Sequence, residues 1–171
     1  MVLKLVYFLT RRQFGMVATP LAVFSARMPV AFMAFSGKVY QLDKKLQVPS
    51  QTRVLIRERV ASINACPFCM DAARWFAVKE SADNAARFDA LAEYRMSPLF
   101  TDAERAALDY ATELTKNKKV DPDTFARLSR YYSERQICEI VWLVASEHLS
   151  NMTNIGLNIG SDGFCQLSPQ R

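Results

Sequence analysis

Apolar residues recur at intervals of three and four along most of the chain, and the alternating pattern of a β-strand is scarce. In the first fourteen residues this spacing places Val2, Leu5 and Phe8 on one side. Near the C-terminus it aligns Ile140 with Val144. Such spacing is typical of amphipathic helices that bury one face. The pattern therefore predicts an all-α protein without an internal repeat.

Prolines and capping residues divide this pattern into separate helices. We expect Ser50 to cap one of them. Thr101 with Glu104, and Ser133 with Gln136, have the form of capping boxes. The predicted helices span residues 1–14, a short stretch opened by Pro20, 29–46, 51–63, 66–79, 83–94, 101–116, 121–131 and a long segment that begins at 133.

The chain has 171 residues, of which 50% are hydrophobic, and this suits a single domain with a substantial core. We expect residues 1–45 to form N-terminal helices packed on the domain, 46–160 to form its core, and 161–171 to be an irregular tail. The net charge of +5 comes from scattered lysines and arginines, without a basic block. The composition therefore does not indicate a nucleic-acid partner.

The N-terminal segment raises the question of export. Arg11 and Arg12 resemble a twin-arginine signal, but Pro20, Arg27 and Pro29 interrupt the apolar stretch that follows. That stretch also falls short of the roughly 20 continuous apolar residues of a membrane span. We therefore expect a cytoplasmic protein that does not associate with membranes.

The feature with the most chemical content is the pair Cys66 and Cys69, in the run from Asn64 to Asp71. Pro67 suits the first turn of a helix, which places Cys66 at its N-terminus. Backbone N–H groups and the helix dipole favour a thiolate there, and a second cysteine one turn later is positioned to form a disulfide. The spacing predicts a redox-active pair, in which the more exposed cysteine attacks and the more buried one resolves.

Other interpretations of the cysteines remain open. The pair can be buried structural residues, or half of a zinc site, although only Cys138, Cys165 and His148 remain as further soft ligands. Met70 stands where a c-type haem motif requires histidine, which excludes haem attachment. We expect no metal and no cofactor. We expect Cys138 to lie in the core. Cys165 is expected to be an idle thiol, with a third redox thiol as the alternative.

The segment from Arg53 to Asp71 resembles the carboxymuconolactone decarboxylase and alkylhydroperoxidase D superfamily, and the similarity extends over roughly residues 45–160. The resemblance implies an all-α helical bundle of the alkylhydroperoxidase D type and a homo-oligomer, either a dimer, a trimer or a hexamer. Redox-active members of this superfamily reduce peroxides through a thiol–disulfide cycle. Its decarboxylase members act on a lactone and do not use a CxxC pair.

The chain departs from the peroxidase members at two positions. Those proteins have a glutamate twelve residues before the first cysteine and a histidine four residues after the second. These positions are Val54 and Ala73 here. We hypothesise that His148, the only histidine, assists proton transfer at the cysteines and is oriented by Glu147 or Glu58. The alternative is a hydrogen-bonded structural histidine.

The function favoured by these observations is a thiol–disulfide oxidoreductase with alkylhydroperoxidase-type activity. Its catalytic residues would be Cys66, Cys69, His148, Glu147 and Glu58. Its partners would be a small hydroperoxide or lactone-like substrate and a dithiol reductant. The alternatives are a lactone-processing enzyme similar to the decarboxylases, or a non-catalytic helical oligomeric module with structural cysteines. A thiol of low pKa would favour the redox function, and a pair that is inert until unfolding would favour the structural one.

Overall fold

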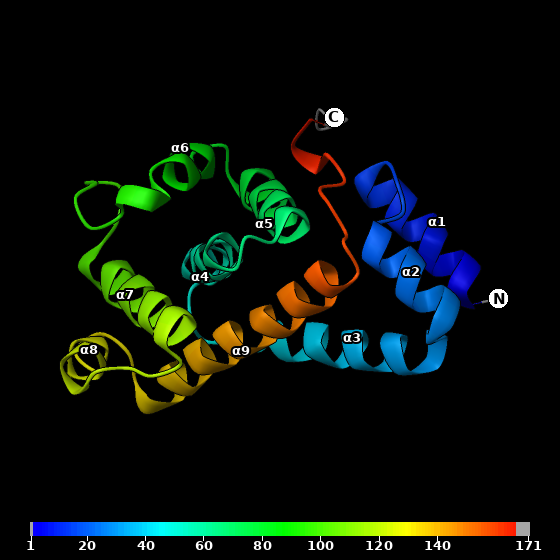
Figure 1. Cartoon of the computed structure of the whole chain (residues 1–171). Helices are drawn as coiled ribbons and strands as arrows, with labels where there is room; N and C mark the ends of the chain where they lie inside the picture. The colour runs from blue at the N-terminus through cyan, green and yellow to red at the C-terminus, as the bar shows by residue number, and fades with distance from the viewer. Residues whose placement is uncertain (1, 167–171) are drawn as a thin grey trace. The chain divides into compact units, whose positions relative to one another are not determined.

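The computed structural model describes residues 2–166, and within this range every regular element is helical (Figure 1). The all-α prediction is confirmed. Met1 and residues 167–171 of the expected tail lie outside the described residues. The α-helices are α1 (Val2–Phe14), α2 (Thr19–Arg27), α3 (Pro29–Asp43), α4 (Ser50–Ile63), α5 (Pro67–Glu80), α6 (Asn84–Asp89), α7 (Asp102–Asn117), α8 (Pro122–Leu128) and α9 (Glu134–Gly156), and two 3₁₀ turns, η1 and η2, cover Leu91–Glu93 and Phe164–Gln166.

The chain forms two compact units. The larger unit comprises residues 47–161. The described part of the smaller unit comprises residues 2–46 and 162–166. Although a separate tail is expected at 161–171, Asp162 binds Thr19 within the smaller unit, with its carboxylate accepting from the backbone N–H at 2.7 Å and the hydroxyl at 2.5 Å. In the same unit, Phe24 stacks on Phe32.

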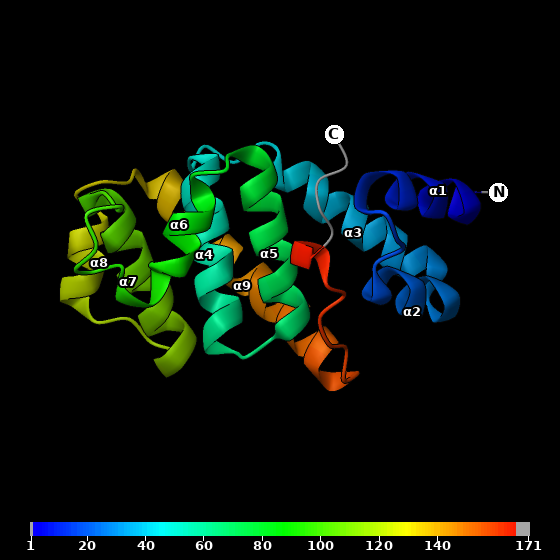
Figure 2. The ribbon, with the colours of Figure 1, turned by 90° about the horizontal axis from the view of Figure 1, so that it is seen from above.

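Helix α4 is the centre of the larger unit, where it contacts α5, α7 and α9 (Figures 1 and 2). Each of these helices supplies apolar side chains to a core from which water is excluded. The largest of the fully buried apolar side chains are Val48, Leu55, Ile56, Val60, Leu108, Leu128, Ile140, Leu143 and Val144. The site described below lies where the buried faces of α4 and α9 change from apolar to polar.

Two of the three expected helix caps are present. Thr101 and Ser133 each accept a hydrogen bond from the backbone three residues later, and both capping boxes are complete. The cap expected from Ser50 is wrong: Pro49 is the N-cap residue and Ser50 is the first helical residue. Its hydroxyl instead donates to the Glu80 carboxylate at 2.6 Å, joining the start of α4 to the end of α5.

The continuous helix expected at 83–94 is broken into α6 and η1. Phe88, Leu91 and Tyr94 are all buried in one cluster with Leu55 and Leu108. These three side chains recur every third residue, which matches the three residues per turn of a 3₁₀ helix. The tighter turn therefore allows the segment to bury Leu91 and Tyr94 on the same side as Phe88.

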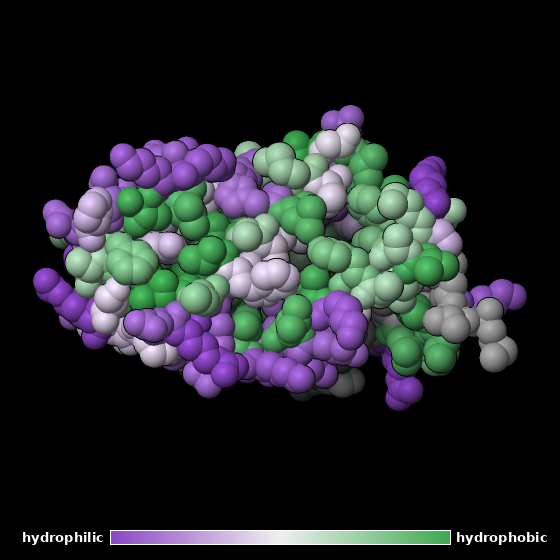
Figure 3. Space-filling model, turned by 90° about the horizontal axis from the view of Figure 1, so that it is seen from below, coloured by the Kyte–Doolittle hydropathy of each residue, from purple (hydrophilic) through white to green (hydrophobic). Residues whose placement is uncertain are grey.

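Apolar side chains are visible over much of the face in Figure 3. On α9 the exposed ones include Val141, Leu149, Met152 and Ile155, whose spacing forms a stripe along the helix. Within the described residues, no helix is long and apolar enough to cross a membrane.

Replacing Leu108 with alanine tests the core. Leu108 is fully buried, so Leu108→Ala should lower the free energy of unfolding by about 2–5 kcal/mol. Leu99 is 46% exposed, and Leu99→Ala should change the same quantity by less than about 1 kcal/mol. Urea denaturation of the two variants measures the difference. Equal effects would show that Leu108 is not part of the core.

Candidate functional site

The connection between α4 and α5 places Cys66 at the start of its helix. Ala65 adopts a left-handed conformation with φ of 52°. The N–H of Ala65 donates to the Ser62 carbonyl at 3.2 Å, and that of Cys66 to the Ala61 carbonyl at 3.0 Å. This pair of bonds is a Schellman motif, which ends α4 and turns the chain. Cys66 is the N-cap of α5, and Pro67 begins the helix as predicted.

A disulfide joins Cys66 to Cys69, with their Cα atoms 5.3 Å apart. Neither of the two cysteines is exposed. Cys66 is fully buried and Cys69 is 6% exposed, because Ala61 and Phe68 pack against them. Cys66 also makes no side-chain capping hydrogen bond. Cys69 is therefore the more accessible residue, by a small margin.

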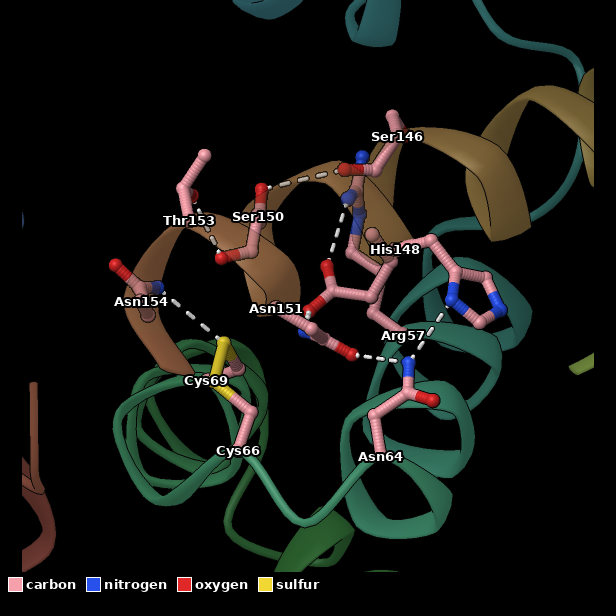
Figure 4. The surroundings of a disulfide bond; sticks show 11 residues. Arg57, Asn64, Cys66, Cys69, Ser146, His148, Ser150, Asn151, Thr153 and Asn154 are labelled. Atoms are coloured by element: carbon pink, nitrogen blue, oxygen red, sulfur yellow. Dashed lines mark hydrogen bonds and ion pairs between the residues drawn. A yellow bond between two sulfur atoms is a disulfide. The ribbon is translucent and has the colours of Figure 1, made fainter. Parts of the chain in front are cut away.

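The side of the disulfide that faces α9 is polar. Asn154 points from α9 toward the sulfurs, and its Nδ2 donates to Cys69 Sγ at 3.4 Å (Figure 4). Its Oδ1 is buried and has no hydrogen-bond partner among the described residues. The cysteines thus lie between an apolar layer and a buried amide.

A separate chain of hydrogen bonds lies one turn earlier on α9. Asn151 is fully buried, and its Nδ2 donates to Glu147 Oε1 at 2.7 Å. Glu147 Oε2 accepts from the Arg57 guanidinium at 3.0 Å. Asn64 Nδ2 donates to Asn151 Oδ1 at 2.8 Å (Figure 4). Since buried polar groups are costly unless paired, these bonds fix α9 against the end of α4.

Glu58 is a buried carboxyl group on α4. Burial and the negative charge of Glu147 together raise its pKa to about 8, against the opposing effect of the positive charge of Arg74. Its Oε2 has no hydrogen-bond partner among the described residues. Glu58 is therefore a carboxylic acid at neutral pH, one helical turn before the Ala61 that packs on the cysteines.

His148 lies beside this network, where Asn64 is a hydrogen-bond partner of its ring. Its Nδ1 is 3.1 Å from Asn64 Nδ2, an amide that can only donate, so Nδ1 accepts. Burial lowers the pKa of His148, and the positive charge of Lys118 lowers it further. The ring is therefore mainly neutral at pH 7, and Asn64 connects it to Asn151.

Val54 and Ala73 occupy the positions at which the peroxidase members have their glutamate and histidine. Both are partly buried and pack against the apolar cluster that contains Leu55. Glu58 is one helical turn from Val54 on the same helix. Any proton transfer at the cysteines must therefore use groups other than those at 54 and 73.

Three residues of the site were not identified as such from the sequence: Asn64, Asn151 and Asn154. A signal for two of them was present. The apolar row through Ile140 and Val144 continues at helical spacing through the polar residues Glu147, Asn151 and Asn154, all of which are buried. Polar residues on an otherwise buried helix face indicate a hydrogen-bonded site.

The other two cysteines are outside the disulfide. Cys138 is exposed, so the expectation that it lies in the core is wrong. On α9 it follows the buried Ile137, and successive side chains of an α-helix point about 100° apart. Cys165 is exposed as well. Within the described range, no cluster of three or more histidine, cysteine, aspartate or glutamate side chains could hold a metal ion.

Comparison with known proteins places this geometry in a family. No family model matches the chain. The chain is 30% identical over 165 residues to the uncharacterized protein YnjA of Escherichia coli, covering 95% of this chain and 90% of YnjA. It is 25% identical over 116 residues to the uncharacterized protein YdfG of Bacillus subtilis, covering 67% of this chain and 78% of YdfG.

Solved structures share the fold. The debrominase Bmp8 matches with a TM-score of 0.81 and 23% identity, covering 96% of this chain and 88% of Bmp8. A peroxidase-related protein with an alkylhydroperoxidase D core, from Ralstonia eutropha, matches with a TM-score of 0.80 and 20% identity, covering 95% of this chain and 86% of that protein. The chain therefore belongs to one family with YnjA, and its all-α fold is that of the solved alkylhydroperoxidase D core.

Proposed function

We propose that the chain is a thiol–disulfide oxidoreductase that reduces hydroperoxides with Cys66 and Cys69 as its redox couple. The observation that carries the proposal is that the buried disulfide accepts a hydrogen bond from the buried Asn154 amide instead of facing hydrocarbon alone. A purely structural disulfide would not need an amide directed at one sulfur. The fold shared with peroxidase-related proteins supports the same chemistry.

In this proposal Cys69 attacks the substrate and Cys66 resolves the product. Cys69 is the more accessible of the two residues, and the Asn154 amide would stabilise its thiolate by a charge-assisted hydrogen bond. Cys66, at the N-cap of α5, is held within bonding distance of Cys69. Its thiolate would be favoured by the free N–H groups of the first helical turn.

The oxidation step transfers one oxygen atom. The Cys69 thiolate attacks the distal oxygen of the hydroperoxide, the O–O bond breaks, and Cys69 becomes a sulfenic acid. The departing alkoxide takes a proton to leave as an alcohol, and Glu58, protonated at neutral pH, supplies it. Cys66 then attacks the Cys69 sulfur, the S–O bond breaks, and hydroxide leaves with the thiol proton as water.

An external dithiol restores the couple. Its first thiolate attacks Cys69, displaces the Cys66 thiolate and forms a mixed disulfide, and its second thiol then releases reduced Cys69. The net reaction converts a hydroperoxide and a dithiol to an alcohol, water and a disulfide. Such a reductant is available in a reducing compartment, and the cytoplasmic location stays a prediction on this basis.

Two other expectations also stay predictions. Assembly as a homo-oligomer is supported by the exposed apolar stripe on α9, which includes Leu149 and Met152. A lactone-like substrate has less support, because the buried groups at this site surround a disulfide. The catalytic roles of Glu147 and His148 are likewise untested, and we assign Glu147 the task of holding Asn151.

Serine variants test the couple directly. Reduced Cys66→Ser should react once with cumene hydroperoxide and retain a sulfenic acid on Cys69, which dimedone and mass spectrometry detect. Cys69→Ser should lose at least about a hundredfold in peroxide reduction, because it lacks the attacking thiolate. The control Cys138→Ser removes an exposed thiol and should behave as the wild type.

Wild-type turnover by Cys69→Ser would contradict this assignment of the attacking sulfur. The substrate class is tested separately with 2,3,4-tribromopyrrole, because a structure of a cysteine-to-alanine variant of the debrominase Bmp8 contains this compound. If the reduced wild type consumes this compound and leaves hydroperoxide untouched, the couple is a redox couple but the peroxidase assignment is wrong.

The pKa of Glu58 predicts how stability depends on pH. Below its ordinary pKa of 4.5 the carboxyl group is protonated in both folded and unfolded chains. Between 4.5 and about 8 only the unfolded chain ionises, so the folded protein loses stability as pH rises. Relative to wild type, Glu58→Gln should gain up to about 5 kcal/mol across this window. Denaturation at several pH values measures the gain, with exposed Glu93 changed to glutamine as control; a pH-independent difference would show that Glu58 ionises normally.

Replacing His148 with glutamine tests whether its ring transfers protons at the cysteines. If His148 transfers protons at the cysteines, His148→Gln should lower peroxide reduction by about tenfold or more and shift its pH profile. If the ring only accepts a hydrogen bond from Asn64, glutamine can replace it and neither quantity should change. Initial rates between pH 5 and 9 distinguish the two roles.

A further inference from the structure

Asn154 donates a hydrogen bond to the disulfide, and its own hydrogen-bonding capacity is only half satisfied. It is 4% exposed, and its Nδ2 donates to Cys69 Sγ at 3.4 Å. Its Oδ1 is buried without a hydrogen-bond partner among the described residues. Figure 4 shows the side chain extending from α9 toward the disulfide. An unmade hydrogen bond in a buried site is unfavourable, so the amide is poorly matched to the disulfide form.

Reduction creates the groups that this amide lacks. The disulfide takes up two electrons and two protons, the S–S bond breaks, and two thiols form. Release of one proton then leaves a thiolate beside a thiol. A neutral disulfide sulfur is a weak acceptor, whereas a thiolate is a strong one for the Asn154 N–H. A thiol supplies an S–H donor, which the free Oδ1 can accept.

The geometry points to Asn154 as a positioning residue that stabilises the reduced Cys66–Cys69 couple and so makes its disulfide easier to reduce. The same hydrogen bond lowers the pKa of the Cys69 thiol. This inference deepens the proposed function and rests on it only for the role of Cys69 as the attacking thiol. Val54 and Ala73 are apolar and cannot favour a thiolate. In their place, the uncharged amide of Asn154 favours the Cys69 thiolate.

Other titratable or charged groups lie on the elements packed around the cysteines, and the test leaves them all unchanged. They include Arg57 and Glu58 on α4, Asp71 and Arg74 on α5, and Glu147 and His148 on α9.

The experiment compares wild type with Asn154→Leu, which keeps the approximate size but removes donor and acceptor. In glutathione redox buffers the variant's equilibrium should shift about tenfold toward the disulfide, equivalent to a reduction potential about 30 mV more negative. In a Cys66→Ser background, the pH midpoint for alkylation of Cys69 should rise by about one unit. The control is Asn84→Leu, which removes another buried amide, bonded to the Ala77 carbonyl, without touching a sulfur.

If Asn154→Leu and Asn84→Leu both keep the wild-type potential and alkylation midpoint, Asn154 is a packing residue and the inference is overturned. If Asn154→Leu does not fold, Asn154→Asp decides: it keeps the shape but loses the N–H donor, so its midpoint should rise, and a wild-type midpoint would overturn the inference. These measurements need no peroxide. A shift in potential without peroxidase activity would support the role of Asn154 while rejecting the proposed function.

Discussion

The hydrogen bonds of Asn151 hold the site together. This fully buried side chain on α9 binds Asn64 at the end of α4 and Glu147 on its own helix, and Glu147 in turn binds Arg57. Asn64 immediately precedes the turn that delivers Cys66 to the start of α5. The place of the cysteines relative to α9 therefore depends on buried polar contacts, which tolerate fewer alternative packings than apolar contacts do.

The site handles charge by keeping one carboxyl group paired and another neutral. Glu147 is bonded to an arginine and to an amide, whereas Glu58 is buried without a strong partner and retains its proton at pH 7. The environments of two nearby carboxyl groups thus push their proton affinities apart, an arrangement that separates a proton donor from a structural anion. Positions 54 and 73 are apolar in this chain. Glu58 is the acidic residue closest in sequence to position 54, where the peroxidase members have a glutamate.

Local signals in the sequence were sufficient for much of the fold. The capping boxes at Thr101 and Ser133, and Pro67 at the start of α5, are determined by neighbouring residues and were predicted correctly. Burial of the cysteines was not predicted, because it depends on contacts with Phe68 and with α9, a helix distant in sequence. Periodicity identifies the faces of α9 only approximately, and for this reason Cys138 was wrongly placed in the core. Asn154 was missed because its contact with Cys69 joins residues 85 positions apart.

The central claim is that the buried pair is a redox couple that acts on hydroperoxides. The most direct measurement is the stoichiometry of a single turnover, in which fully reduced protein is mixed with limiting cumene hydroperoxide and its thiols and disulfides are mapped by peptide mass spectrometry. The account predicts one Cys66–Cys69 disulfide and one cumyl alcohol for each hydroperoxide consumed, with Cys138 and Cys165 still reduced. Consumption of hydroperoxide without this disulfide, or a pair that stays reduced until the protein unfolds, would contradict it.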